Sequence, residues 1–242
     1  MNATDISSIW DTFDFVGVVT FTGYAKSRIP ALRQSLSRIG LWDKVHLHWC
    51  FPTRYNDKLI SCLKTCKAGT RPGAFNATMG HYAVLKSAYE LGAKHALVME
   101  DDVRFAEDTG LLATGFQSLP SDYDIAKAEW YFRKCETPAS KAKVAPIPGN
   151  GRWAPMQGFS FWGDGCTAFS RKGMEWKIRL IERGLRSEFL VCDYFYTPEF
   201  IKNDLKAYMS IPVLAQQGVT ESTMHAMHKR YEHSYCDGIK YI

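Results

Sequence analysis

The sequence lacks the patterns that would place the protein in a membrane, in a secretory pathway or on nucleic acid. No apolar run approaches the roughly 20 residues that cross a bilayer, and the N-terminal segment MNATDISSIWDTFDF carries acids where a signal peptide carries positive charge. The net charge of +5 is modest, and no Lys/Arg run with interleaved aromatic residues marks a nucleic-acid groove. We therefore expect a cytoplasmic protein without a nucleic-acid partner; peripheral attachment to the inner face of a membrane stays open.

Paired cysteine motifs are also missing. The seven cysteines are an odd number, no two form a CxxC pair, and the spacing of Cys62 and Cys66 is not repeated downstream as a zinc site would require. Free thiols in a reducing compartment are therefore expected. No internal repeat or low-complexity tract is present. A chain of 242 residues with 46% hydrophobic content has the size for one large α/β domain or two small ones.

Strands and helices alternate along the first half of the sequence. The predicted elements are a buried strand at Phe15–Phe21, a helix over 29–39 that ends at Gly40, a strand over 44–49, a helix over 57–66, a loop over 69–73, a helix over 77–91 that ends at Gly92, and a strand from His95. This order is the doubly wound α/β pattern. The later elements are a strand over 123–128, a loop over 138–153, a helix over 171–183 and a strand from Val213.

Three consecutive acidic residues, Glu100, Asp101 and Asp102, follow the apolar strand directly in HALVMEDDVRF. Acids at the mouth of a buried strand are costly unless a cation lies beside them. In open α/β sheets, ligands bind at the carboxyl ends of the strands. A divalent metal ion with a diphosphate bound to it suits this position, although an acidic loop or a helix N-cap would use the same residue types.

The segment GHYAVLKSAYELGAKHALVMEDDVRF (Gly80–Phe105) resembles the helix and acidic strand of glycosyltransferase family 25. That family includes lipooligosaccharide galactosyltransferases of bacteria and collagen galactosyltransferases of animals. Four later segments resemble the family in the same order: LPSDYDIAKA, CTAFSRKGMEWKI, VCDYFY and PVLAQQGVTEST. The opening strand departs from it, because VVTFTGYAKSR stands where the family has Asn-Leu-Asp-Arg, and at the start of the Ala77 helix only His81 matches.

The resemblance implies a GT-A-type doubly wound mixed sheet flanked by helices, in a single domain over residues 1–242. The nucleotide-binding part would span about 14–128 and the acceptor-binding part about 129–242. The implied reaction is inverting transfer of a hexose, galactose in particular, from a UDP-sugar to a glycan or glycolipid acceptor such as lipooligosaccharide, assisted by Mn²⁺ or Mg²⁺.

The candidate site residues fall into three groups. Those expected to bind the metal are Asp102, Glu100 and His225. Those expected to contact the nucleotide are Thr20, Thr22, Arg28, His81, Glu100, Asp101 and Asp124. Those considered as the base that deprotonates the acceptor hydroxyl are Asp193 and, as the alternative, Asp164.

Several of these residues also have a plain structural interpretation. Arg28 and His225 can be solvated surface groups, His81 a hydrogen-bonded buried histidine, Asp193 a helix N-cap, and Asp124 a support for its strand. Two other functions stay open as well. The acidic triplet can serve a two-metal phosphohydrolase or nuclease, and the same fold can act as a non-catalytic nucleotide-sugar-binding protein.

Overall fold

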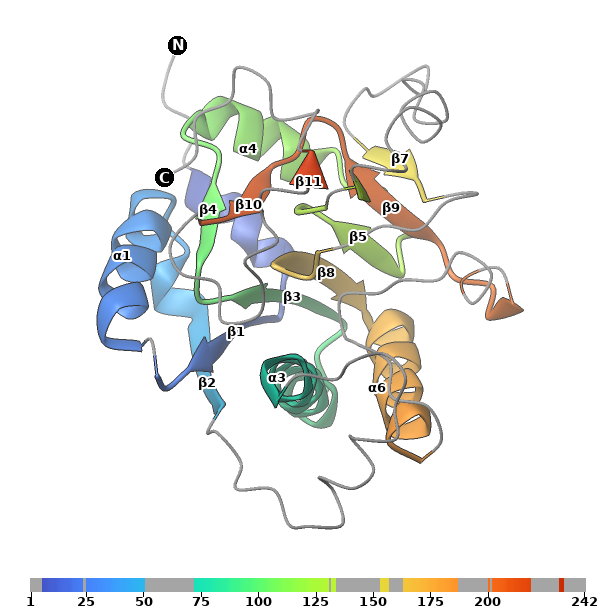
Figure 1. Ribbon diagram of the computed structural model, residues 1–242. Coiled ribbons are helices and arrows are strands. Elements are labelled where there is room, and N and C mark those ends of the chain that lie inside the picture. Colours follow the sequence, from blue (N-terminus) through green and yellow to red (C-terminus); the bar gives the residue numbers. More distant parts are fainter. Residues whose placement is uncertain are drawn as a thin grey trace.

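The computed structural model describes residues 6–23, 25–50, 72–130, 132–133, 153–156, 163–186, 200, 202–218 and 231–232. Its centre is a seven-stranded mixed sheet in the order β2-β1-β3-β8-β5-β9-β7 (Figure 1). These strands are β1 (Phe15–Phe21), β2 (Val45–Cys50), β3 (His95–Glu100), β5 (Ile125–Lys127), β7 (Trp153–Pro155), β8 (Cys166–Ser170) and β9 (Ala207–Ser210). The other described strands form two small antiparallel pairs. One pairs β4 (Val103–Phe105) with β10 (Ala215–Gln217), and the other pairs β6 (Phe132–Arg133) with β11 (Tyr231–Glu232).

Five strands of the large sheet share one direction, because β1 is parallel to β2 and to β3, and β5 is parallel to β9. The inserted strand β8 runs antiparallel to β3 and to β5, so β3 and β5 point the same way. The carboxyl ends of β1, β3 and β5 therefore meet at one edge of the sheet, where the amino end of β8 also lies. Ligand sites of open α/β sheets form at this edge.

Helices cover both faces of the sheet (Figure 1). Helices α3 (Pro72–Glu90) and α6 (Arg171–Arg186) lie side by side on one face, joined by a hydrogen bond of 2.8 Å from the Tyr82 hydroxyl to Glu182. Helices α1 (Ala25–Arg38) and α4 (Thr109–Gln117) and the 3-10 helix η1 (Ile6–Thr12) pack on the other face, and a second 3-10 turn, η2 (Trp42–Lys44), leads into β2.

The two faces of β3 show why the central strands are apolar throughout. Leu97 and Met99 pack into the cluster under α1 and α4, whereas Ala96 and Val98 pack into the cluster under α3 and α6. Successive side chains of a strand point to opposite faces, so a strand covered on both sides needs apolar residues at every position. The expected α/β mixed sheet flanked by helices is thereby confirmed.

The first helix begins earlier than the sequence predicts. Helix α1 starts at Ala25, not at Ile29, so Pro30 is its sixth residue and Arg28 is in the first turn instead of in a loop. Pro30 is on the exposed side of the helix, where water can satisfy the carbonyl that loses its N–H partner. The predicted end is correct: Gly40 adopts φ +67 and the Leu41 amide bonds to the Leu36 carbonyl at 2.9 Å.

Helix α3 also starts before the predicted Ala77, at Pro72, so Pro72 and Gly73 of the predicted loop belong to the helix. Proline suits a first helical position because its missing N–H would be unpaired there anyway. The predicted helix over 57–66 and nearly all of the predicted loop over 138–153 lie outside the described residues. Within the described ranges, no helix has the length and apolar character needed to cross a bilayer.

Candidate functional site

The turn between β3 and β4 carries the three acidic residues, and all three side chains are buried. Glu100 is 7% exposed, Asp101 0% and Asp102 6%. The Asp101 amide bonds to the carbonyl of Val19 at 3.1 Å, which attaches the turn to the end of β1. The acids thus lie at the carboxyl edge of the sheet, as the sequence predicts.

Arg28 neutralises part of this charge. The residue is 5% exposed, and its guanidinium lies 2.7 Å from Asp101 Oδ1 and 3.4 Å from Asp102 Oδ2. The other Asp101 oxygen accepts the Phe21 amide at 2.9 Å, so both oxygens of Asp101 are engaged. Sequence alone left Arg28 as either a ligand contact or a surface cation. In the structure it is a buried counter-ion, because the early start of α1 turns it inward.

Asp102 differs from its neighbours in having a free oxygen. Its Oδ1 is buried and has no hydrogen-bond partner in the described part of the chain. Burial, followed by repulsion from Glu100, raises the pKa of Asp102 to about 7, although Arg28 opposes the rise. An unpaired buried carboxylate oxygen is unusual in proteins and marks a place for a ligand or cation.

Glu100 is held by two side chains from distant segments. Its Oε1 lies 3.1 Å from His81 Nε2 on α3, and its Oε2 accepts the Gln217 amide at 2.6 Å from β10. His81 is therefore a buried histidine in contact with a carboxylate, which its plain structural interpretation allowed, and its contact with a nucleotide stays a prediction. Because both Glu100 oxygens already have partners, Asp102 is the better placed of the two to bind a metal ion.

Asp164 joins the site from the loop before β8. Its carboxylate lies 3.3 Å from Lys177 Nζ on α6, 3.6 Å from Lys127 Nζ on β5 and 3.9 Å from His81 Nδ1, and it accepts the Thr167 hydroxyl at 3.1 Å. Burial alone would raise the pKa of Asp164, but the two ammonium groups outweigh it and lower the pKa below its ordinary value. A carboxylate stabilised in this way is a weak base.

Glu129 is a further buried carboxyl at this edge. It is 0% exposed, and its Oε2 accepts the Gly165 amide at 3.0 Å. Burial raises the pKa of Glu129 to about 8 against the opposing charge of Lys127. Burial likewise raises the pKa of the neighbouring Cys166 thiol, so this cysteine is not a reactive thiolate.

Among the described residues, the buried carboxyls of this cluster outnumber its buried cations. With His81 left aside, the ionisable groups are the carboxyls of Glu100, Asp101, Asp102, Glu129 and Asp164 and the cations Arg28, Lys127 and Lys177. Full ionisation would leave an excess of two negative charges, and the raised pKa values of Asp102 and Glu129 keep these two carboxyls partly protonated near neutral pH. A buried excess of this kind is costly, and a divalent cation has the charge that would neutralise it.

The described residues contain no group of three or more His, Cys, Asp and Glu side chains arranged to hold a metal ion by themselves. Magnesium-like ions often use only one or two carboxylates and take the remaining ligands from water and substrate phosphates. The free oxygen of Asp102 fits that kind of site.

The other predicted residues are distributed as follows. Thr20, near the end of β1, is fully buried, and its hydroxyl has no partner among the described residues; Thr22 is half-buried just beyond the strand. Asp124 lies at the opposite end of the sheet, where it accepts the Ser170 hydroxyl at 2.9 Å, so its contacts are those of the strand support that the sequence also allowed. Asp193 and His225 lie outside the described residues.

Sequence reasoning missed three charged residues, Lys127, Glu129 and Lys177. A signal for Lys177 was present, because it falls three residues after Met174 and four before Ile181, in the buried stripe of an amphipathic helix. A lysine in such a stripe needs a buried anion. Lys127, inside an apolar strand, carries the same signal, whereas Glu129 follows that strand without one.

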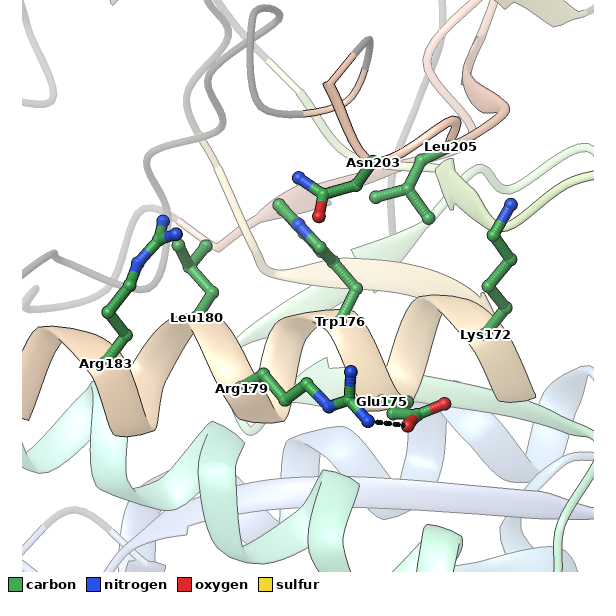
Figure 2. A pocket seen from close by; sticks show the side chains of 8 residues that line it. All are labelled: Lys172, Glu175, Trp176, Arg179, Leu180, Arg183, Asn203 and Leu205. Carbon is green, nitrogen blue, oxygen red and sulfur yellow. Dashed lines mark hydrogen bonds and ion pairs between the residues drawn. The ribbon is translucent and has the colours of Figure 1, made fainter.

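A cavity of about 310 Å³ lies elsewhere, on the outer side of α6 (Figure 2). Its lining residues are Lys172, Glu175, Trp176, Arg179, Leu180, Arg183, Asn203 and Leu205. Lys172 lies 3.5 Å from Asp124, at the end of the sheet away from the acidic turn. Arg179 is paired with Glu175 at 2.5 Å, as the dashed line in Figure 2 shows. This cavity therefore contributes nothing to the acidic cluster.

Comparison with known proteins gives several remote structural neighbours, among them two transferases. No protein-family model matches the sequence, and no curated protein matches it significantly. One neighbour is a mannose-1-phosphate geranyltransferase from Thermus thermophilus, with 13% identity, a TM-score of 0.37, and coverage of 84% of this chain and 74% of that chain. The other is a mannosyltransferase from Pyrobaculum calidifontis in complex with GDP-Man and Mn²⁺, with 13% identity, a TM-score of 0.41, and coverage of 93% of this chain and 66% of that one.

At this level of similarity, neither neighbour assigns a chemistry to this chain. The resemblance to glycosyltransferase family 25 accordingly stays a prediction.

Proposed function

We propose that the chain is a metal-dependent hexosyltransferase that takes its sugar from a nucleoside-diphosphate donor bound at the acidic turn. The observation that carries the proposal is the unpaired carboxylate oxygen of Asp102. Its Oδ1 is buried without a partner among the described residues, at the carboxyl end of β3. It belongs to a cluster with more buried carboxyls than buried cations among the described residues, and a divalent cation there would reduce the repulsion between these carboxyls and a bound diphosphate.

The parts of the turn have different roles in this proposal. Asp102 holds the metal together with donor phosphates, and Asp101 and Glu100 shape the turn through Arg28, His81 and the β1 backbone. A divalent cation at that position would neutralise the charge of the departing nucleotide. The unpartnered Thr20 hydroxyl, one residue beyond the Val19–Glu100 pair, is available to the donor.

The finer assignment rests on the resemblance to family 25. It makes the donor a UDP-sugar, UDP-galactose in particular, the reaction inverting, and the acceptor a glycan such as lipooligosaccharide or another surface polysaccharide. Residues 14–128 would bind the donor and residues 129–242 the acceptor. Asp193 is the proposed base. The lowered pKa of Asp164, caused by Lys177 and Lys127 against the effect of burial, makes it the poorer candidate.

The phosphohydrolase alternative receives no support from the contacts of the turn. A two-metal site needs several carboxylates with oxygens to spare. Both oxygens of Asp101 and both of Glu100 are already engaged by protein groups.

The test is nucleotide release from a panel of UDP- and GDP-sugars, with and without Mn²⁺, catalysed by the wild-type protein, by Asp102→Asn and by Asp43→Asn. Asp43 is an exposed acid on η2, far along the chain from the turn, and serves as the matched control. We expect Mn²⁺-dependent release from one donor, a loss of at least about a hundredfold in Asp102→Asn, and wild-type rates in Asp43→Asn.

Calorimetry with UDP or GDP and Mn²⁺ then separates the outcomes. Binding without turnover of any donor would support the non-catalytic interpretation. Metal-independent release, or an active Asp102→Asn variant, would refute the proposed role of the turn. If Asp193 is the base, Asp193→Ala retains Mn²⁺-dependent nucleotide binding and loses transfer to the acceptor.

A further inference from the structure

Arg104 is a cation near the acidic turn that has no ion-pair partner among the described residues. It is the middle residue of β4, two positions after Asp102, and its side chain is half-buried. Val103 and Phe105 on either side of it are fully buried in the core. Because successive side chains of a strand point to opposite faces, Arg104 points away from that core.

The guanidinium of Arg104 lies beside Gly218, which follows β10. Strand β10 pairs with β4 (Figure 1), and the Gly218 amide bonds to the Asp102 carbonyl at 2.7 Å. A Cβ at residue 218 would lie 2.9 Å from that carbonyl oxygen and 3.6 Å from Cζ of Arg104. The lack of a side chain at Gly218 therefore lets the guanidinium and the backbone of Asp102 lie close together.

Most of the hydrogen-bonding capacity of Arg104 is unused. Its Nη1 donates to the Val103 carbonyl at 2.8 Å, and this is the one hydrogen bond of its side chain to a described residue. A guanidinium has five N–H donors in a planar fork. Arg28, in contrast, is held by Asp101 and Asp102. Of the two arginines at the acidic turn, Arg104 is thus the one that retains donors for a bound anion.

We propose that Arg104 binds the diphosphate of the nucleotide-sugar donor and stabilises the charge of the departing nucleotide. This inference rests on the proposed function, which places the donor phosphates at Asp102. Arginine forms paired hydrogen bonds to phosphate oxygens and keeps its charge at any physiological pH. Since the guanidinium lies close to Asp102, a diphosphate bound at the acidic turn is within its reach.

The charge that Arg104 would stabilise appears during the transfer itself. The bond between the anomeric carbon and the β-phosphate oxygen breaks, and its electron pair stays on that oxygen. The acceptor oxygen bonds to the anomeric carbon and gives its proton to a base. The nucleoside diphosphate therefore leaves with one more negative charge than it carried in the donor. A cation that interacts with this charge more strongly in the transition state than in the bound donor raises kcat.

The kinetic test compares the wild-type protein with Arg104→Met, Arg104→Lys and Arg38→Met. Methionine removes the charge, whereas lysine keeps the charge without the planar fork. Arg38, an exposed arginine on α1, provides the matched control. With the donor that the wild type uses, kcat of Arg104→Met should fall at least about a hundredfold and by more than the donor KM rises. Arg104→Lys should have an intermediate kcat, and Arg38→Met that of the wild type.

A second readout does not depend on turnover. In calorimetry with Mn²⁺, the nucleotide that the wild type binds, UDP or GDP, should bind Arg104→Met about ten to a hundred times more weakly than Arg38→Met. Uridine and guanosine, which lack phosphates, should not distinguish the two variants. The melting temperatures without nucleotide should agree, since the described bond of the Arg104 side chain is to its own strand.

The outcomes are separable from those of the proposed function. If no donor turns over but nucleotide binding depends on Arg104, the proposed function fails and the phosphate contact stands. A wild-type kcat in Arg104→Met would overturn this inference and leave the proposed function intact. Equal nucleotide affinity in all four proteins would also overturn it, as would a wild-type protein that binds neither UDP nor GDP. A loss of affinity accompanied by a melting temperature several degrees lower would make the role of Arg104 structural and equally overturn the inference.

Discussion

Replacing Arg28 by Met is the sharpest test of how the acidic turn is stabilised. Methionine fills much of the same volume but removes the cation that lies 2.7 Å from Asp101 and 3.4 Å from Asp102. Removing one partner of a buried ion pair costs about 3 to 5 kcal/mol, since it leaves a buried charge without compensation. For a chain of this size, we expect the melting temperature to fall by about 10 °C.

The matched control is Arg38→Met on the same helix. Arg38 lies 4.0 Å from Glu107, and these side chains are 51% and 45% exposed, so the loss should stay below about 1 kcal/mol. Urea denaturation and thermal melting, each at pH 5 and pH 7.5, measure both variants. Without Arg28 the pKa of Asp102 rises further above its already raised value. The Arg28→Met penalty should therefore be smaller at pH 5, where the carboxyl is protonated in the folded state.

Manganese provides the second half of this experiment. If Asp102 binds a divalent cation, Mn²⁺ should raise the melting temperature of Arg28→Met more than that of Arg38→Met, because the turn has lost its internal cation. Equal stability of the two variants in the absence of metal would refute the reasoning. It would mean that Arg28 does not compensate the buried acids.

Three further predictions concern packing, hydrogen bonding and pH. Gly173→Ala should cost roughly 3 kcal/mol in urea denaturation, because a Cβ there would lie 1.9 Å from the Asp124 carbonyl and force α6 away from β5; a loss below about 1 kcal/mol would contradict this packing. Trp153→Phe should cost about 1 kcal/mol, since it removes the buried bond of 2.7 Å from the indole N–H to the Gly115 carbonyl, which then keeps only the Ser118 hydroxyl at 2.9 Å; unchanged stability would show that the indole bond contributes nothing. Glu129 has a folded-state pKa raised from 4.5 to about 8 by burial, so the folded state binds its proton more tightly and wild-type stability should fall as the pH rises through that interval. Glu129→Gln should lack this fall in equilibrium unfolding, and an identical pH dependence of the two proteins would contradict the raised pKa.

The local sequence pattern alone was sufficient to predict the central strands and the position of the three acidic residues. FVGVVTF and HALVME have apolar residues at nearly every position, which is what a strand covered on both faces requires. Glu100, Asp101 and Asp102 follow such a strand in sequence, so their place at its carboxyl end was predictable. The stop at Gly40 was predictable for the same local reason, because glycine readily adopts the positive φ that ends a helix.

Helix starts were less accessible to sequence reasoning. A helix that begins at Ile29 would have Pro30 in its first turn, but Pro30 is the sixth residue of α1 and is on its exposed side, where water can satisfy the freed carbonyl. This difference of four residues changed the expected environment of Arg28 from a loop to a buried contact with Asp101. Local propensity is a weak guide at such a boundary because packing overrides it.

Apolar periodicity and chain order act over a few residues, so the sequence is sufficient to place Glu100, Asp101 and Asp102 at the end of the buried strand β3, at one edge of an α/β sheet. Which cations and further carboxyls join them depends on the tertiary structure. Lys127, Glu129, Asp164 and Lys177 meet because β8 inserts antiparallel between β3 and β5 and because α6 packs beside α3. Such register and packing depend on contacts between residues far apart in the chain, which local patterns do not specify.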